Sequence, residues 1–339
     1  MRIGYNPHRN QIHQPSGFKH QVIVPVYIPN QEGYFKDAFK ILKYCLGSLF
    51  KTCHSQTFFT IVNNGSAPEI VDYLDSLFAE NKIHEIIHTT NCGKLNAILK
   101  GLSGNNFPLI TITDADVLFL NRWQEETYKI FDAFPKAGAV CPTPSARSYK
   151  ITTSNIWLEL FFSKSLYFRK VKNPLALQAF ADSVGNPEFY SNDHKTTYLT
   201  VKKNDTIAVV GAGHFSVTYK NDIFETLNTK FSNYKLGGDS EMEILDLPVV
   251  KKGLWRLSTQ DNFAYHLGNV SEPWMNDTFS SLQENNFEPM NTLKYKKVAA
   301  SKIGFYIKYR WFNKVLHTKR IMTKFLIWKG LSKSAAKNY

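Results

Sequence analysis

The sequence predicts an α/β fold with a mostly parallel central sheet that is flanked by helices and wound as in nucleotide-binding domains. The first observation is that strand-like and helix-like segments alternate over residues 21–141. The second is a buried-looking strand, 107–113, that runs directly into Asp114 and Asp116. The third is that a chain of 339 residues with 43% apolar content can bury a full core.

The predicted elements are short apolar, β-branched runs separated by segments of helical periodicity. The predicted strands are 21–27, 58–66, 83–88, 107–113 and 137–141, and the helices between them are 35–51, 68–80, 94–102 and 121–134. Pro68 fits the first turn of its helix, where proline costs no hydrogen bond. Because each strand is followed by a helix, consecutive strands are expected to run parallel.

After Pro142 the pattern becomes mixed, and segments 155–162 and 205–218 are expected to form a second half that covers the carboxyl edge of the sheet. The predicted organisation is an irregular arm 1–19, a first half 20–142, a second half 143–290, and a basic tail 291–339. Tryptophans such as Trp255 fit either core packing or a sugar-binding platform.

Charge and composition limit the classes of function. The net charge is +13, but 13 Lys and Arg lie in residues 289–339, where there is no acid, so the rest of the chain holds 28 basic and 28 acidic residues. The excess positive charge therefore belongs to one segment and not to the body. The four cysteines show no metal-binding spacing, and no apolar run is long enough to span a bilayer, so we expect a cytoplasmic protein.

The triplet Asp114, Ala115, Asp116 follows the most strongly apolar predicted strand. In open α/β sheets ligands bind at the carboxyl ends of the strands. Two carboxylates held close together repel each other and favour a divalent cation, which in turn favours a diphosphate. An ordinary Asp-rich turn is the alternative.

Motifs in a defined order resemble those of the inverting glycosyltransferase family 2, which has a GT-A fold. They are V-P-V-Y (24–27), I-V-N-N-G-S (61–66), N-C-G-K-L-N-A-I-L-K-G (91–101), D-A-D (114–116), G-G-D-S-E (237–241) and A-Y-H-L-G-N (264–269). The resemblance covers roughly residues 20 to 270 and implies transfer of a sugar from a nucleotide diphosphate donor.

By this resemblance the donor's base would lie against Pro25 and Tyr27, and Asn64 would read it. The family usually has an aspartate at the place of Asn64; an amide oxygen accepts the same hydrogen bond from uracil, which favours a UDP-sugar. Gly93 and Lys94, before a helix, would approach the ribose or the diphosphate. Turns, packing and a solvated lysine are the alternatives for these positions.

The resemblance also implies a metal site. Asp116 would ligate the ion, Asp114 would contact the ribose or a metal-bound water, and His266 would be a third ligand; a core histidine is the alternative. Two carboxylates and an imidazole suit Mn²⁺ better than Mg²⁺, because imidazole is a softer ligand than Mg²⁺ prefers.

For catalysis, inversion needs a general base that takes the proton of the acceptor hydroxyl. The segment 237–243 supplies Asp239 as the predicted base and Glu241 as the reserve; an N-cap with two exposed acids is the alternative. In the second half, His214 in G-A-G-H-F-S and Trp255 are predicted to contact the acceptor.

The basic tail interleaves cations with aromatic residues. We expect residues 294–337 to bind an anionic membrane surface, which places the protein on the inner face of the cell membrane. An RNA-binding tail or helices docked on the body are the alternatives, and nucleic acid is the less favoured partner.

Together these features predict an inverting, metal-dependent hexosyltransferase that acts on a glycan hydroxyl, with a lipid-linked acceptor, in the synthesis of surface polysaccharide or lipopolysaccharide. A GT-A-like binding protein without turnover stays an alternative, because Asn64 and Gly238 depart from the family pattern. A nucleotidyltransferase is a second one, although Pro29 and Glu32 occupy the place of its glycine-rich, basic loop.

Overall fold

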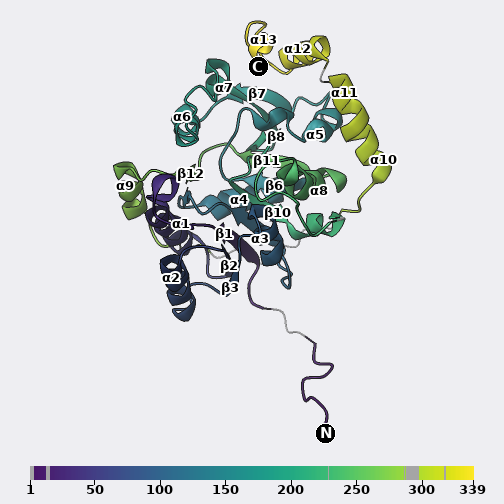
Figure 1. Ribbon diagram of the computed structural model, residues 1–339. Coiled ribbons are helices and arrows are strands. Elements are labelled where there is room, and N and C mark those ends of the chain that lie inside the picture. Colours follow the sequence, from purple (N-terminus) through teal and green to yellow (C-terminus); the bar gives the residue numbers. More distant parts are fainter. Residues whose placement is uncertain (1–3, 13–15, 228, 286, 288–297, 317) are drawn as a thin grey trace.

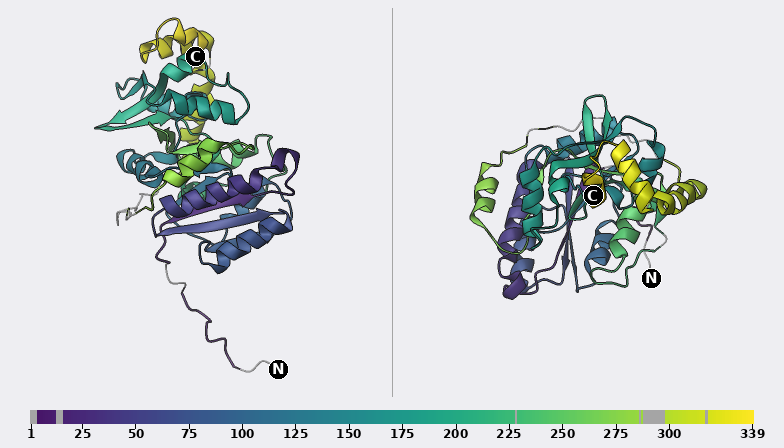
Figure 2. Two further views of the ribbon diagram at one scale, coloured as in Figure 1. Left: turned by 90° about the vertical axis from the view of Figure 1, so that its left-hand side faces the viewer. Right: turned by 90° about the horizontal axis from the view of Figure 1, so that it is seen from above.

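The computed structural model describes residues 4–12, 16–227, 229–285, 287, 298–316 and 318–339. Its body contains a ten-stranded sheet in the order β3-β2-β1-β4-β10-β6-β11-β9-β8-β7, with helices on both faces (Figures 1 and 2). The N-terminal arm extends away from the body as an irregular segment (Figure 1). Among the described residues, no helix combines the length and the apolar character needed to cross a bilayer.

The first half confirms the predicted alternation of strands and helices. Its elements are β1 His20–Val26, α1 Ala38–Thr52, β2 Thr57–Asn64, α2 Pro68–Ala79, β3 Glu85–Thr89, α3 Lys94–Gly101, β4 Leu109–Thr113, β5 Val117–Phe119, α4 Trp123–Ala133 and β6 Ala137–Cys141. Strands β1 to β4 pair in parallel, with β1 between β2 and β4. Their carboxyl ends therefore meet at one edge, as the sequence predicts.

Side-chain alternation along β1 explains why helices cover both faces of this part of the sheet. Val22 and Val24 lie in one cluster with the apolar faces of α1 and α2, whereas Ile23 lies in another with α3. Because both faces are buried, the strand reads as a continuous apolar run instead of an alternating one.

The second half joins the same sheet and does not form a separate one. Its elements are α5 Ser154–Glu159, β7 Leu166–Lys170, α6 Pro174–Ser183, α7 Asn192–Thr196, β8 Thr197–Lys203, β9 Thr206–Val210, β10 Ser216–Lys220, α8 Leu247–Lys251, β11 Trp255–Thr259, β12 Ala264–His266 and α9 Pro273–Ser281. Strand β10 lies antiparallel between β4 and β6, and β11 pairs in parallel with β6. The later strands thus complete a mixed sheet.

A small second sheet forms next to the carboxyl end of β4. Strands β5 and β12 pair antiparallel, and the register sets His266 opposite Val117. The Leu267 N–H donates to the Asp116 carbonyl at 2.8 Å. This pairing returns the chain, about 150 residues later, to the D-A-D triplet.

The C-terminal segment packs against the body, which agrees with the docked-helix alternative. Its elements are α10 Lys302–Phe305, α11 Phe312–Leu316, α12 Lys319–Trp328 and α13 Ala335–Asn338. Phe325 stacks on Trp157 and Phe161, and Tyr149 donates its hydroxyl proton to the carbonyl of Tyr339 at 2.8 Å. Residues 291–297 and 317 of the predicted tail lie outside the described residues. The described part of the tail is therefore attached to the body through a subset of its apolar residues, which belong to the core.

Candidate active site

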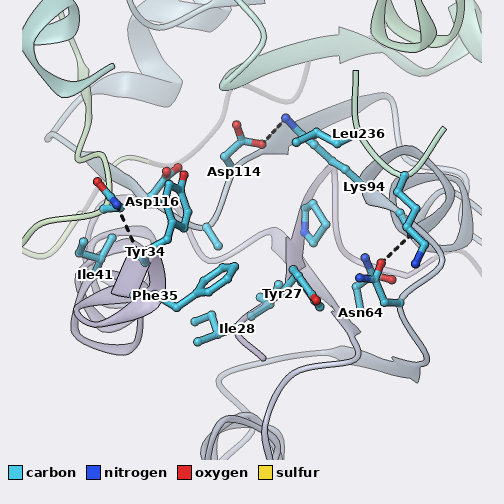
Figure 3. Close-up of a pocket in the computed structure, with 18 of the residues that line it drawn as sticks. Tyr27, Ile28, Tyr34, Phe35, Ile41, Asn64, Lys94, Asp114, Asp116 and Leu236 are labelled. Atoms are coloured by element: carbon cyan, nitrogen blue, oxygen red, sulfur yellow. Dashed lines mark hydrogen bonds and ion pairs between the residues drawn. The ribbon is translucent and has the colours of Figure 1, made fainter. Parts of the chain in front are cut away.

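A cavity of about 360 Å³ lies at the carboxyl ends of β1, β2 and β4 (Figure 3). All eight residues predicted to bind the nucleotide-sugar line it: Pro25, Tyr27, Asn64, Gly93, Lys94, Asp114, Ala115 and Asp116. They come from four separate motifs, and the parallel strand order brings them to one place.

Lys94, the first residue of α3, joins two acidic segments at one side of the cavity. Its Nζ lies 2.7 Å from Asp114 Oδ1 and 3.0 Å from Glu241 Oε1. Burial would lower the pKa of Lys94, but the two carboxylates outweigh it and raise that pKa above its usual value. The side chain is therefore a fixed positive charge and not a solvated lysine. Figure 3 shows its contact with Asp114 at the wall of the cavity.

Asp116 and His266 meet on the opposite side through the β5–β12 pairing. His266 Nε2 lies 3.4 Å from Asp116 Oδ2, and the Ser183 hydroxyl lies 2.9 Å from His266 Nδ1. Burial raises the pKa of Asp116. The His266 ring acts in the opposite direction and lowers this pKa, and the Asp114 carboxylate raises it further. Asp116 Oδ1 is buried and has no hydrogen-bond partner among the described residues. The structure thus brings two of the three predicted metal ligands, Asp116 and His266, together.

The described ranges contain no cluster of three or more His, Cys, Asp or Glu side chains arranged to hold a metal ion. The paired carboxylates are instead bound to cationic or neutral neighbours, Asp114 to Lys94 and Asp116 to His266. The unpartnered Asp116 Oδ1 and the His266 ring close to the same carboxylate are nevertheless donor types that suit a divalent cation.

Asn64 lies at the end of β2, buried in the cavity wall. Its Oδ1 accepts the Cys92 N–H at 2.9 Å, which ties the end of β2 to the loop before α3. Cys92 Sγ lies 3.3 Å from the same oxygen, so both lone pairs of Asn64 Oδ1 already face a donor of Cys92. Asn64 is therefore both a structural link and a lining residue.

The sequence analysis missed the loop that covers the start of α3. Asn96 Nδ2 donates to the Ser232 carbonyl at 2.8 Å, and the Ser232 N–H donates to Asn96 Oδ1 at 2.8 Å. The Lys94 N–H donates to the Lys235 carbonyl at 2.9 Å. Lys235 and Leu236 of this loop line the cavity. Asn96, in the motif 91–101, was the residue from which a contact with such a loop could have been predicted.

A second cavity of about 300 Å³ lies beside the first, with aromatic walls. Its lining includes Phe180, Phe189, Tyr190, His214, Phe215 and His266. His266 of this cavity lies 3.4 Å from Asp116 of the first cavity, and His214 Nδ1 lies 3.5 Å from Oε2 of Glu241, which in turn contacts Lys94 of the first cavity. This arrangement can hold two different ligands side by side.

Three predicted residues, Asp239, Glu241 and Trp255, line neither cavity, although Glu241 contacts lining residues of both. The Asp239 side chain is exposed to solvent and lines neither space. Trp255 begins β11 on the far side, where it packs on Phe134 and donates its indole N–H to Glu159 at 2.9 Å. Trp255 therefore lies with the core, the packing alternative.

Comparison with known proteins gives one family match. Residues 22–185 match the family described as glycosyl transferase family 2. No curated protein matches the sequence. Similar solved structures include S. aureus TarS 1-349 in complex with UDP-GlcNAc, at 10% identity and a TM-score of 0.46, over 94% of this chain and 69% of that chain.

Another similar structure is the mannosyltransferase PcManGT from Pyrobaculum calidifontis in complex with GDP-Man and Mn²⁺. It is 14% identical, with a TM-score of 0.41, over 72% of this chain and 55% of that chain. The family match spans β1 to α6 and so contains most of the cavity described above. The segment 22–185 therefore matches glycosyl transferase family 2, the family that the sequence motifs resemble.

Proposed function

We propose that this enzyme transfers a sugar, with inversion, from a UDP-linked donor to a hydroxyl of a glycan. The observation that carries the proposal is the cavity at the carboxyl edge of β1, β2 and β4, which gathers all eight residues predicted for the donor. The base of the nucleotide would lie between Tyr27 and Asn64. The diphosphate would extend toward Lys94 and the D-A-D triplet.

The aspartates of the D-A-D triplet supply the oxygen ligands that a divalent cation would use. Asp116 and His266 would hold it, and Asp114 would reach it or the ribose. The buried, unsatisfied Asp116 Oδ1 supports this assignment. When bound, the cation neutralises the charge that builds on the leaving diphosphate. The imidazole among the ligands favours Mn²⁺ over Mg²⁺.

Glu241 is the better supported general base. Its carboxylate contacts Lys94, which lines the first cavity, and His214, which lines the second, whereas Asp239 is exposed. The acceptor oxygen would attack the anomeric carbon as the bond to the diphosphate breaks, and Glu241 would take the hydroxyl proton. Lys94 would hold both Asp114 and Glu241 in place during this step.

The acceptor would occupy the second cavity. Its aromatic walls suit the apolar face of a sugar ring or the first part of a lipid carrier. We therefore propose a lipid-linked saccharide as the acceptor, in the synthesis of a surface polysaccharide or lipopolysaccharide. Domain roles follow from this assignment, with the donor on 20–142 and the acceptor on 143–290.

Calorimetric titration with UDP, GDP and dTDP, each with and without Mn²⁺, tests the donor site. We expect UDP to bind tightly only with Mn²⁺, and Asp116→Asn to lose that dependence. Asp132→Asn, an aspartate on α4 outside both cavities, serves as the control and should bind UDP as the wild type does. Absence of binding by all three nucleotides would favour a protein without a donor site, and release of UDP from a UDP-sugar would exclude the alternative without turnover.

The docked C-terminal helices support a second proposal, binding to an anionic membrane surface on the cytoplasmic side. Exposed cations in this segment are Lys302, Arg310, Lys314, Lys319, Arg320, Lys324, Lys333 and Lys337. Large exposed apolar side chains accompany them: Ile303, Tyr306, Ile307, Trp311, Ile321 and Trp328. Each cation near such a surface contributes about 1 kcal/mol, and the indoles settle at the headgroups.

Sedimentation with vesicles of phosphatidylcholine, with or without phosphatidylglycerol, tests this proposal. We expect binding only to the anionic vesicles, and a large loss of binding in the Trp311→Ser, Trp328→Ser double variant. Phe78→Ser, which removes an exposed aromatic residue from α2, is the control and should leave binding unchanged. Equal sedimentation with both vesicle types would contradict the proposal.

A further inference from the structure

The loop between β9 and β10 carries His214, which contacts the ion pair of Asp246 and Arg256. Both side chains of this ion pair are buried. His214 Nε2 lies 3.0 Å from both carboxylate oxygens of Asp246. Asp246 is fully buried at the end of a π-helical turn, and its Oδ1 lies 2.8 Å from Arg256 Nη2. A buried carboxylate needs such a partner to stay ionised.

Arg256 is fixed by the backbone around the same loop. Its guanidinium donates to the carbonyl oxygens of Ile151 at 3.0 Å and Ala212 at 2.9 Å. The side chain is 1% exposed. Asp246 therefore has a fixed orientation, and so does the imidazole that contacts it.

The contact with Asp246 determines which nitrogen of His214 is available. Both ring nitrogens face a carboxylate, but Asp246 is the nearer one, at 3.0 Å from Nε2 against 3.5 Å between Nδ1 and Glu241, so the hydrogen of a neutral ring is expected on Nε2. Nδ1 then faces Glu241 Oε2 at 3.5 Å, and the ring also lines the aromatic cavity. Lys94 contacts the other oxygen of Glu241. Glu241 thus lies between a permanent cation and an oriented imidazole.

We infer that the Asp246–Arg256 pair is a positioning device for His214, and that His214 Nδ1 shares the proton that Glu241 takes from the acceptor. This inference rests on the proposed function. During transfer the bond between the acceptor oxygen and the anomeric carbon forms, and the diphosphate leaves with the electrons of the broken bond. The acceptor proton moves to Glu241, is shared with His214 Nδ1, and passes to solvent after release.

The first variant tests the different roles that the two ring nitrogens of His214 are inferred to have. Gln in place of His214 can still donate to Asp246 through its amide but offers no basic nitrogen toward Glu241. We expect His214→Gln to lower kcat for UDP release from a UDP-sugar and acceptor by about 10- to 100-fold. The KM for the donor should stay within about two-fold, because the donor cavity is unchanged. An unchanged kcat would overturn the inference.

The second variant, Asp246→Asn, removes the carboxylate and keeps the shape. Its matched control is Asp222→Asn, which removes a carboxylate from another buried cation, Lys252, at 3.3 Å and outside both cavities. We expect Asp246→Asn to lower kcat and Asp222→Asn to leave it unchanged. Thermal unfolding of both variants separates lost function from lost folding.

A spectroscopic readout tests the orientation independently of turnover. Long-range nitrogen–proton NMR of histidine-labelled protein distinguishes the two neutral tautomers of His214. We expect Nε2–H in the wild type and loss of this preference in Asp246→Asn. A Nδ1–H tautomer in the wild type would overturn the inference. If the wild type turns over no UDP-sugar, the proposed function fails while the tautomer still decides the positioning role.

Discussion

Gly93 occupies a backbone position at the donor cavity that other residues fit poorly. Its φ is +89°, and a Cβ there would lie 2.6 Å from Lys235 Cα, in the loop that covers the start of α3. Such a distance is shorter than carbon atoms tolerate without a shift of the backbone. The loop, the lysine beside it and the cavity wall therefore depend on the absence of a side chain.

We expect Gly93→Ala to lower the free energy of unfolding by about 1–3 kcal/mol and to weaken UDP binding. Gly104→Ala is the matched control, because Gly104 has a φ of +83° but open space around its Cβ position. It carries the same backbone strain without the clash and should retain UDP binding. Urea unfolding and calorimetry measure both effects, and equal UDP affinities in the two variants would contradict the steric argument.

The donor-side residues could be predicted from the sequence because each follows a recognisable strand. The contacts among these residues could not be predicted from the sequence. Lys94 and Glu241 are separated by 147 positions, and their contact depends on how the second half folds back. Asp246 and Arg256 were missed altogether, since a buried ion pair leaves no local pattern in a sequence. Asp239 and Glu241 are two positions apart, and only the fold distinguishes the exposed one.

At the scale of elements, α12 shows that a cationic segment can also be a core helix. Phe325 is 3% exposed and stacks on Trp157 with ring centroids 4.8 Å apart. Its neighbours on the helix, Lys324 and Ile321, are exposed. The cations are the most evident feature of this segment in the sequence. The apolar residues between them, however, attach the helix to the body.

We expect Phe325→Ala to cost about 3–5 kcal/mol of unfolding free energy, because it removes a large side chain from a packed cluster. Ile321→Ala, on the same helix and 40% exposed, should cost less than about 1 kcal/mol. Urea denaturation of both variants measures the difference. Similar losses in the two would mean that the helix does not pack as described.

The strand and helix order of the first half was predictable because each element is encoded locally by periodicity and turn residues. Two features were not. Strand β5 has three residues, too few for a pattern, although it brings His266 to Asp116. The insertion of β10 between β4 and β6 depends on pairing over about 100 residues, which local periodicity does not report.

At the scale of the whole molecule, two buried histidines link stability to pH. Burial holds the pKa of His20 well below its usual value, and burial followed by the charge of Lys19 lowers that of His54 to about 4. Both are neutral in the folded protein and bind protons when it unfolds near pH 6. Their contribution is therefore complete above about pH 6.5 and is lost as the pH falls toward 4.

We expect the unfolding free energy to fall between pH 6.5 and 5 by about 1.4 kcal/mol per pH unit for each histidine. Urea unfolding across this range measures the slope. His54→Gln should reduce this slope by the contribution of one histidine. His8→Gln, in the exposed N-terminal arm, should leave the slope unchanged. A pH-independent wild type would contradict this assignment.

The position of β10 also bears on how the protein is made. Strand β4 has β1 on one side and takes β10, residues 216–220, on the other. Before residues 216–220 have been synthesised, the nascent first half exposes β4, an apolar strand whose backbone groups are unpaired on one side. A fragment truncated at residue 185, the limit of the family match, would keep this open edge permanently. The boundaries of the family motif are therefore not those of an autonomous folding unit, and expression of that fragment should yield aggregates instead of a donor-binding domain.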